Sequence, residues 1–245
     1  MGIHLIYKPI GKTPLDMLGD IKEKKKSYAG RLDPMAHGLM LILTNEHCLM
    51  QNEFHNFDKQ YKFDILIGFS TDTSDILGLL KNKITRCFDK NTSPKKNNIC
   101  KIIKEIIGQQ YQYYPPYSSV RINKKPLWFW AKNNMLDNIT IPGKFITIYS
   151  LDLISINKIS GVDLKKQILK KLAMLGDRQN CFREREIIEQ WENVDFNDYY
   201  TTITLDTYVS CGTYIRELSN LICSKLRTNG LCLDIYRDMV GEYVL

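Results

Sequence analysis

The strand-like and helix-like stretches of this sequence follow one another without a regular alternation, and this order constrains the fold more than any other feature. Apolar residues at period two, or in short continuous runs, predict strands over residues 3–7, 39–43, 59–69, 145–156 and 201–209. Helical spacing predicts helices over 13–21, 93–107 and 212–226 and two within 163–192, while 27–34 and 111–120 are predicted loops. A doubly wound sheet would need regular strand–helix–strand spacing, so we predict a mixed α+β fold.

The composition is that of a globular protein. The 245-residue chain has 44% hydrophobic residues, no internal repeat and no obvious linker, so we expect one domain over residues 1–245. Its longest charge-free apolar stretch, roughly residues 34–45, is too short to cross a bilayer. The first residues lack the basic region, apolar region and cleavage site of a signal peptide. We therefore expect neither a membrane protein nor a secreted one.

The cysteines and histidines indicate neither a disulfide framework nor a metal site. The seven cysteines are odd in number and show no CxxC spacing. We therefore expect reduced thiols in a cytoplasm-like compartment. The four histidines do not supply the closely spaced ligand pairs that zinc requires, so we predict no bound metal.

The positive charge of the chain is arranged in clusters. Lys and Arg number 34 against 27 Asp and Glu, a net charge of +7 that is weak evidence alone. Four lysines lie within residues 22–26, and Lys124 and Lys125, flanked by Arg121 and Lys132, follow an aromatic loop. Phosphates attract cations and unstacked bases attract flat side chains, so the clusters favour a nucleic-acid-binding protein. Solvated helix ends and turns are the alternative for each cluster.

The most specific short motif surrounds Asp33. Its carboxylate lies between Gly30, which allows a tight turn, and Pro34, which restricts the next φ. Apolar neighbours on both sides favour presentation of this carboxylate in a cleft, whereas an ordinary Asp-Pro turn is the alternative. No GxGxxG, GxxxxGK[ST], GxSxG or HExxH motif occurs, which disfavours dinucleotide enzymes, P-loop enzymes, hydrolases of the GxSxG type and zincins.

Six segments, in the same order and over nearly the whole chain, resemble motifs of the TruB-type tRNA pseudouridine synthases. They are Lys8-Pro9-Ile10-Gly11, the motif from Gly30 to Gly38, Lys59-Gln60-Tyr61 with Gly68 and the loop from Thr71 to Gly78, Pro115 to Arg121 with Leu127-Trp128 and Ala131-Lys132, Cys211 to Arg216, and Arg237 with Gly241. One such match alone would be weak, but six in order make the resemblance specific.

The resemblance implies the family's fold, a mixed and largely antiparallel central sheet flanked by helices, and an isomerase activity. Such an enzyme breaks the N-glycosidic bond of a uridine, turns the base and rejoins it through carbon, without redox change and without a cofactor. Asp33 matches the essential aspartate, which either attacks the sugar or removes a proton from it. Arg216 matches the arginine that pairs with this carboxylate. Tyr61 matches the aromatic residue against the target base, although its strand pattern equally fits a core tyrosine.

Other motif positions and the charge clusters are the expected RNA contacts. They are Lys8, Tyr28, Arg31, Arg121, Lys124, Lys125, Lys132 and Arg237. Tyr28 stands where the family usually has His, so contacts to the extruded nucleotides should differ. His37 stands where Thr is common, and we expect it to make a local hydrogen bond. Asp72 and Asp75 have the spacing of metal ligands, but neighbouring Thr and Gly residues favour a hairpin-like loop.

Two larger segments depart from the family pattern. Residues 157–199 are expected to hold a helical insertion between two strands that the family joins closely. Its mixed charge favours a structural or partner-binding helical pair over an RNA clamp. Many family members carry a C-terminal PUA domain, and because this chain stops soon after Gly241 we expect none, with weaker or differently distributed RNA affinity.

The resulting prediction is a monomeric, cytoplasmic enzyme that converts a uridine of RNA to pseudouridine. The family implies uridine 55 in the T-arm of tRNA as the target, and a synthase acting on rRNA or another RNA is an alternative. A non-catalytic RNA-binding or RNA-folding protein on the same scaffold is an alternative of a different class. The joint presence of Asp33, Tyr61 and Arg216 disfavours it, because binding alone needs no paired carboxylate. A metal-dependent hydrolase built on Asp33, Asp72 and Asp75 is a third.

Overall fold

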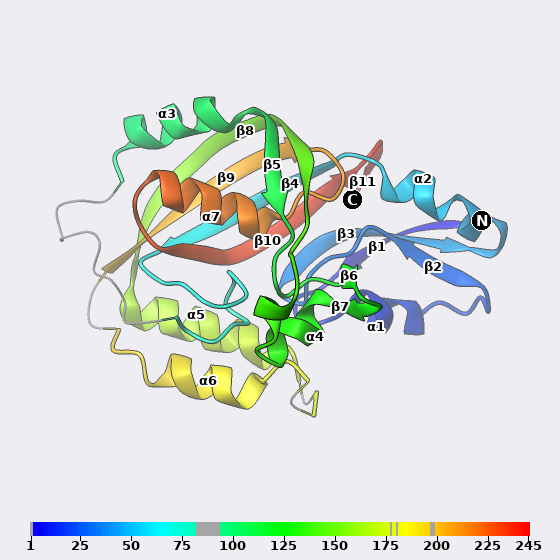
Figure 1. Ribbon diagram of the computed structural model, residues 1–245, viewed down its shortest axis with the longest axis horizontal. Coiled ribbons are helices and arrows are strands. Elements are labelled where there is room, and N and C mark those ends of the chain that lie inside the picture. The colour runs from blue at the N-terminus through cyan, green and yellow to red at the C-terminus, as the bar shows by residue number, and fades with distance from the viewer. Residues whose placement is uncertain (1, 82–93, 177, 180, 197–198) are drawn as a thin grey trace.

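The computed structural model describes residues 2–81, 94–176, 178–179, 181–196 and 199–245. In this part of the chain, nine strands form one mixed sheet, and β6 (Arg121–Ile122) and β7 (Lys125–Pro126) form a separate small hairpin. Helices pack against both faces of the sheet, which confirms the predicted α+β fold (Figure 1). Cys87, the predicted helix start at residue 93, and residues 177, 180, 197 and 198 of the predicted insertion lie outside the described residues.

The sheet has the strand order β1-β3-β10-β4-β9-β8-β5. These strands are β1 (Ile3–Lys8), β3 (Ala36–Thr44), β10 (Gly230–Val240), β4 (Lys59–Ile67), β9 (Tyr199–Val209), β8 (Gly143–Ser160) and β5 (Gly108–Tyr113), with β2 (Lys26–Ala29) beside β3 and β11 (Tyr243–Val244) beside β10. Among the described pairs of this sheet, β3 with β10 is parallel and the others are antiparallel. The register places Arg237 opposite both Gly38 and Tyr61, so three of the motif segments meet at one point.

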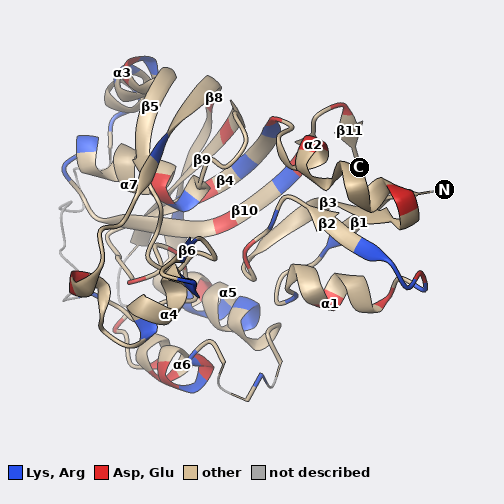
Figure 2. Ribbon diagram, turned by 45° about the vertical axis from the view of Figure 1, so that its right-hand side comes forward, with Lys and Arg blue, Asp and Glu red and all other residues tan. Residues whose placement is uncertain are grey.

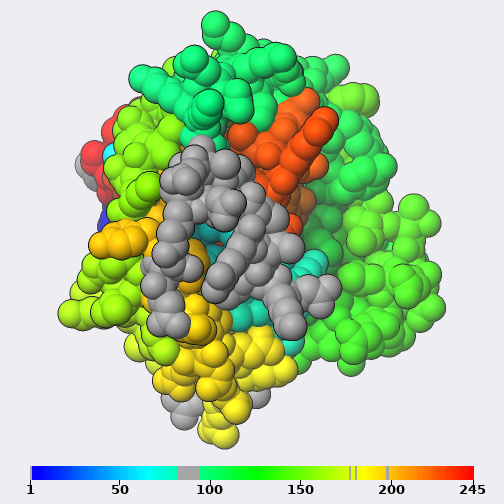
Figure 3. Space-filling model, turned by 90° about the vertical axis from the view of Figure 1, so that its left-hand side faces the viewer, coloured from blue at the N-terminus to red at the C-terminus, as the bar shows by residue number. Residues whose placement is uncertain are grey.

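Two hydrophobic cores lie on opposite faces of the sheet, because neighbouring residues of a strand point to opposite sides. Ile65 packs in the core under α3 (Lys96–Ile106) and α7 (Ile215–Lys225), whereas Leu66 packs in the core under α5 (Gly161–Ala173) and α6 (Glu184–Glu192). The side view shows α3 and α7 in the upper half and α6 in the lower half (Figure 3). The sheet is therefore covered on both faces by helices from the middle and the C-terminal half of the sequence.

Shorter helices border the sheet. They are α1 (Pro14–Gly19), η1 (Asn45–Met50), α2 (Gln51–His55), α4 (Leu127–Lys132) and η2 (Leu136–Asn138). The predicted start of α1 is confirmed: Thr13 is the N-cap, Pro14 is the first helical residue, and Thr13 and Asp16 form a capping box. In the part of the chain that the structure describes, no helix combines the length and the apolar character needed to cross a membrane.

The sequence-based strand predictions were incomplete. Residues 27–29 and 111–113 were predicted as loop but belong to β2 and β5, and β6, β7, β10 and β11 were not predicted. The charges of β10 obscured its apolar alternation. Asp234 is compensated by Lys171 of α5, and Arg237 by backbone carbonyl groups.

Strands β8 and β9 form a long antiparallel pair that reaches from Ile148 opposite Val209 to Ser160 opposite Tyr199. The helical part of the predicted insertion therefore begins at residue 161, because residues 157–160 are still strand. We call residues 161–192 the helical segment. That this segment is an insertion relative to the family remains a prediction.

Candidate active site

Asp33 lies in the loop between β2 and β3. The Ala36 N–H donates a hydrogen bond to the Asp33 carbonyl at 3.0 Å, which closes a tight turn. Downstream of the turn, Gly38 has a φ of +112°, and a Cβ atom there would lie 2.1 Å from the Arg237 carbonyl oxygen. Glycine is therefore required where β3 approaches β10. The turn leaves 35% of the Asp33 side chain exposed.

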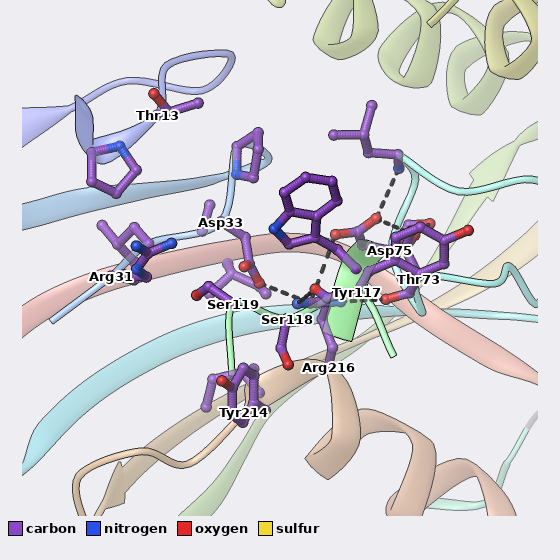
Figure 4. Close-up of a pocket in the computed structure, with 18 of the residues that line it drawn as sticks. Thr13, Arg31, Asp33, Thr73, Asp75, Tyr117, Ser118, Ser119, Tyr214 and Arg216 are labelled. Carbon is purple, nitrogen blue, oxygen red and sulfur yellow. Dashed lines mark hydrogen bonds and ion pairs between the residues drawn. The ribbon is translucent and has the colours of Figure 1, made fainter. Parts of the chain in front are cut away.

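Arg216, in the first turn of α7, holds the Asp33 carboxylate. Its Nε donates to Asp33 Oδ2 at 2.8 Å, its Nη1 to the Thr73 carbonyl at 2.7 Å and its Nη2 to the Tyr117 carbonyl at 3.2 Å (Figure 4). Only 3% of the Arg216 side chain is exposed. Because each of its three nitrogens has an acceptor, the guanidinium is held in one orientation. The structure thus brings the two residues of the predicted pair together.

A second carboxylate, that of Asp75, lies behind this pair. Its Oδ2 is 3.9 Å from Arg216 Nε, while its Oδ1 accepts hydrogen bonds from Thr73 Oγ1 at 2.6 Å and from the Leu77 N–H at 2.9 Å. Burial raises the pKa of Asp75 to about 6, although Arg216 acts in the opposite direction. Burial alone would lower the pKa of Arg216, but Asp33 and Asp75 outweigh it, and the net shift is upward. The guanidinium therefore stays charged between two carboxylates.

The loop around Asp72 and Asp75 is the predicted hairpin. Asp72 N–H donates to the Leu79 carbonyl at 3.0 Å, and Thr71 pairs with Leu80 in an isolated bridge. The Asp72 carboxylate accepts from Arg183 at 2.6 Å. Each aspartate thus faces an arginine. Within the described residues, no three His, Cys, Asp or Glu side chains gather in a group that could hold a metal ion.

A pocket of about 640 Å³ opens at Asp33, a volume that accommodates a ligand the size of a nucleotide. The predicted site residues that border it, apart from Arg237, are Asp33, Tyr61, Arg216, Tyr28, Arg31 and Lys132. Further lining comes from α1, from Trp128 of α4, and from residues 181–183 of the helical segment. Segments from distant parts of the sequence therefore form one cavity around a carboxylate.

Tyr61 lies both in the hydrophobic core and at the pocket wall, and its contact with a target base remains a prediction. It is only 7% exposed and belongs to the core under α3 and α7, and it also lines the pocket. Tyr214, directly before α7, is a second tyrosine of the pocket wall. Burial raises the pKa of Tyr214, and the negative charge of Asp33 adds to this effect. The cavity beside Asp33 therefore has a partly aromatic wall.

The prediction that Lys8 contacts RNA is wrong. Lys8 is fully buried at the end of β1, and its Nζ donates to the carbonyls of Pro9 at 3.0 Å and Lys12 at 2.7 Å. Burial lowers the pKa of Lys8 to about 7. The lysine therefore shapes the turn after β1 from inside the protein.

Arg237, another predicted RNA contact, donates to backbone carbonyl groups, and its contact with RNA remains a prediction. Although it borders the pocket, Arg237 is fully buried. Its guanidinium donates three hydrogen bonds to the carbonyl groups of Leu39, Arg31 and Gly30, at 2.8, 3.1 and 3.1 Å. A buried arginine whose donors are satisfied by backbone stabilises the loop that carries Asp33.

Three predicted RNA contacts, Arg121, Lys124 and Lys125, lie on the exposed β6–β7 hairpin and do not line the pocket. Lys125 Nζ lies 4.3 Å from the centre of the Phe129 ring.

Lys132 does line the pocket, and its Nζ donates to the Cys181 carbonyl at 3.3 Å. Figure 2 shows blue ribbon beside red in the segment between α1 and β2, where Lys22, Lys24 and Lys25 accompany Glu23. The RNA-binding role of these residues remains a prediction.

Tyr28 and His37, the two positions that depart from the family pattern, have different surroundings. Tyr28 lines the pocket, with the Arg31 guanidinium 5.6 Å from the centre of its ring. His37 lies within 2.8 Å of the Tyr7 hydroxyl and 3.0 Å of Asp234 Oδ2. His37 thus forms hydrogen bonds, as expected, but its partners lie 30 and 197 positions away in the sequence.

Several residues that line the pocket were not predicted as site residues, Arg183 and Lys59 among them. Arg183 pairs with Asp72 and lies over the Tyr117 ring, 4.7 Å from its centre. Lys59 lines the pocket, and burial lowers its pKa to about 8. Lys59 and Tyr117 stand inside recognised motifs, which could have indicated them. Arg183 lies in the helical segment, outside every motif, so the sequence held no signal for it.

Comparisons with known proteins agree with this geometry. A sequence model of the TruB family pseudouridylate synthase, N-terminal domain, matches residues 19–168. The chain is 26% identical to tRNA pseudouridine synthase B of Blochmanniella floridana, covering 99% of this chain and 77% of the relative. It is 29% identical to the protein of that name from Fusobacterium nucleatum subsp. nucleatum, covering 100% and 69%, and 30% identical to that from Malacoplasma penetrans, covering 91% and 75%.

Solved structures share the fold. "Crystal Structure of a Cbf5-Nop10-Gar1 Complex" contains a chain that matches 99% of this chain with a TM-score of 0.59 and 14% identity. "Structure of H/ACA RNP bound to a substrate RNA containing 2'-deoxyuridine" contains another, with a TM-score of 0.57 and 13% identity. This chain spans 50% and 48% of the length of those chains. The family model covers more than half of the sequence, and the chain therefore belongs to the TruB family of pseudouridylate synthases.

Proposed function

We propose that this protein converts uridine 55 in the T-arm of tRNA to pseudouridine, with Asp33 as the essential carboxylate. The observation that carries this proposal is the 2.8 Å ion pair between Asp33 and Arg216 at the wall of a nucleotide-sized pocket. The relatives named tRNA pseudouridine synthase B, which align over nearly the whole chain, support tRNA as the substrate. A protein that only binds RNA needs no carboxylate held in such a pocket.

The proposed reaction moves one bond and leaves the composition of the nucleoside unchanged. The bond between C1′ of the ribose and N1 of uracil breaks, the base turns, and C1′ bonds to C5. The proton of C5 is lost, and N1 gains a proton. There is no net oxidation or reduction, so the reaction requires no redox cofactor.

An ionised Asp33 serves either of the two possible first steps. The carboxylate attacks the sugar as a nucleophile, or it removes a proton from the sugar as a base. In both cases the negative charge must be available at the moment of reaction. The Arg216 guanidinium, held by three acceptors, stabilises that charge.

The target uridine must leave its stack before it can reach Asp33, at a cost of a few kcal/mol. The aromatic side chains of the pocket, Tyr28, Tyr61 and Trp128, offer surfaces that offset this cost. Arg31 and Lys132 add positive charge at the same pocket. The β6–β7 hairpin would contact RNA beyond the target nucleotide, because it lies outside the pocket.

The proposal includes a monomeric enzyme in the cytoplasm. Support for a reducing compartment comes from the cysteines, because the six that the structure describes are free thiols. A protein partner at the helical segment, expected from the mixed charge of that segment, remains a prediction.

The test uses an unmodified tRNA transcript, purified protein and buffer without added metal, followed by carbodiimide mapping of pseudouridine. Wild-type protein should modify position 55, whereas Asp33→Asn, which keeps the shape of the side chain but removes its charge, should give no product. A transcript with cytidine at position 55 is the matched control and should gain no pseudouridine.

Each alternative has its own outcome in this test. Binding of tRNA by the wild-type protein without any product would instead indicate a non-catalytic RNA-binding protein. Activity that chelator abolishes would indicate a metal-dependent enzyme. Modification of an rRNA transcript but not of tRNA would support the isomerase activity and would indicate rRNA as its substrate.

A further inference from the structure

Arg183 of the helical segment contacts Tyr117, which lines the pocket, and Asp72, which precedes the pocket-lining Thr73. Its Nη1 and Nη2 donate to Oδ2 and Oδ1 of Asp72 at 2.6 and 3.2 Å, and its guanidinium lies 4.7 Å from the centre of the Tyr117 ring. Only 16% of the Arg183 side chain is exposed. With two nitrogens engaged by one carboxylate, this arginine is directed at the protein more than at solvent.

The two partners of Arg183 belong to the segments that hold Arg216. The Thr73 carbonyl, one residue after Asp72, accepts from Arg216 Nη1, and the Tyr117 carbonyl accepts from Arg216 Nη2 (Figure 4). Arg183 therefore joins, through their side chains, two segments whose backbones orient the Arg216 guanidinium. The Asp33 carboxylate takes its direction from that guanidinium.

Hydrogen bonds before and after Arg183 in the sequence fix the helical segment against the rest of the protein. Arg178 donates to both carboxylate oxygens of Asp16 in α1, at 3.0 and 2.8 Å. Trp191 is fully buried, and its Nε1 donates to the Ile76 carbonyl at 3.1 Å. Contacts on both sides of Arg183 thus tie the segment to α1 and to the 71–80 hairpin.

The backbone of Arg183 is in the left-handed region, with φ of 63° and ψ of 32°. A long side chain seldom adopts this conformation, which persists where the surroundings determine it. The contacts to Asp72 and Tyr117 supply such surroundings.

We propose that Arg183 is a positioning residue of the active site, which orders the Asp72 and Tyr117 segments and through them the Arg216–Asp33 pair. The inference rests on the proposed function. It assigns to the helical segment a part in the reaction beyond a structural or partner-binding one.

The test compares Arg183→Gln with the wild-type protein in steady-state assays on the tRNA transcript. We expect kcat to fall about tenfold while KM changes less than about twofold, because an interaction that only orients catalytic groups does not bind substrate. Arg183→Lys keeps the charge but cannot form the two-pronged contact, so its kcat should lie between the two. Lys166→Gln, at an exposed position of α5, removes the same charge and should leave both constants unchanged.

The pH profile of kcat separates positioning from a loss of folded protein. Burial raises the pKa of Asp75 to about 6, and Arg216 limits that rise. In the Arg183→Gln variant, a less ordered Arg216 would lower the pKa of Asp75 less. Asp75 would therefore become protonated at a higher pH than in the wild-type protein. We therefore expect the acid limb of the profile to move to higher pH in Arg183→Gln and to stay in place in Lys166→Gln.

Four results would overturn the inference. A raised KM with unchanged kcat would make Arg183 a direct RNA contact, and unchanged constants would make it dispensable. A lower kcat that matches a lower folded fraction, with an unmoved acid limb, would make its role purely structural. If the wild-type protein itself forms no product, the proposed function fails and the inference with it. An active wild type beside an equally active Arg183→Gln overturns the inference alone.

Discussion

The buried cations and the exposed cations of this protein use their charge differently. Lys8, Arg216 and Arg237 are at most 3% exposed, and their donors bind backbone carbonyls or Asp33. Lys124 and Lys125, by contrast, are exposed on a two-stranded hairpin. Removing a cation from water is costly unless its donors find acceptors, so each buried cation is matched to particular oxygen atoms. Net charge therefore says little about what an individual basic residue does here.

The buried cations also share a location. Lys8 donates into the turn that follows β1, Arg237 into the loop that carries Asp33, and Arg216 to the Asp33 carboxylate itself. Arg237 and Arg216 thus hold the short loop that carries Asp33, and Lys8 holds the adjacent turn, whose Gly11 N–H donates to the Pro34 carbonyl at 2.8 Å. The exposed cations lie farther out, where long-range attraction to a polyanion matters more than direction.

The largest effect that this comparison predicts is on stability. Arg237→Met keeps much of the side-chain volume but leaves three carbonyl groups of a buried region without donors. We expect the free energy of unfolding to fall by about 3 to 5 kcal/mol, measured by urea denaturation.

Arg121→Met is the matched control for that experiment, because Arg121 is exposed. Its free energy of unfolding should stay within about 0.5 kcal/mol of wild type. Equal losses of unfolding free energy in Arg237→Met and Arg121→Met would contradict the distinction between buried and exposed cations.

The second prediction concerns pH and Lys8. Burial lowers the pKa of Lys8 to about 7 in the folded protein, whereas the unfolded chain has the ordinary value of 10.5. The unfolded state therefore binds more protons between these values, and this lysine makes wild-type stability rise with pH from about 7 to about 10.5.

In Lys8→Met that contribution is absent. The free energy of unfolding of the variant, minus that of wild type, should decrease by about 1 kcal/mol per pH unit above pH 7. Urea denaturation of both proteins at pH 7, 8 and 9 measures this slope. A difference that does not change with pH would show that Lys8 titrates normally in the folded protein.

The smallest predicted effect is on RNA affinity. Replacing Lys124 and Lys125 together by Ala should weaken tRNA binding several-fold and flatten its salt dependence, because fewer counterions are released. Filter binding over a range of salt concentrations measures both quantities. Lys101→Ala with Lys104→Ala on α3 removes two charges from an exposed helix remote from the β6–β7 hairpin and should change neither (Figure 1). An unchanged slope in the hairpin variant would mean that its lysines merely solvate a turn.

Much of the sheet could be predicted from the sequence because its strands carry apolar residues at every second position or in short continuous runs. Residues 59–67 and 199–209 show this pattern directly, and both are strands. Strand β10 was missed because Asp234, Arg237 and Asp238 interrupt its apolar pattern. The compensation of the first two is tertiary, through Lys171 and distant carbonyl groups, and no local rule reveals it.

The candidate site was predictable to the extent that its residues stand in motifs. Asp33, Arg216 and Tyr61 meet at the pocket as expected. Lys8 and Arg237 also stand in motifs, yet a motif does not show whether a cation faces solvent or backbone. The contact of Arg183 with Asp72 could not be predicted, because it depends on the packing of the helical segment against residues more than one hundred positions away.

The parallel pairing of β3 with β10 has a consequence for synthesis on the ribosome. Arg237 binds the Leu39 carbonyl, a partner 198 residues earlier in the chain. Until that strand has emerged, the turn around Asp33 lacks the donors that shape it, and contacts this distant form slowly. In a nascent chain the loop around Asp33 would thus become ordered late, after most of the residues that line the pocket have been synthesised.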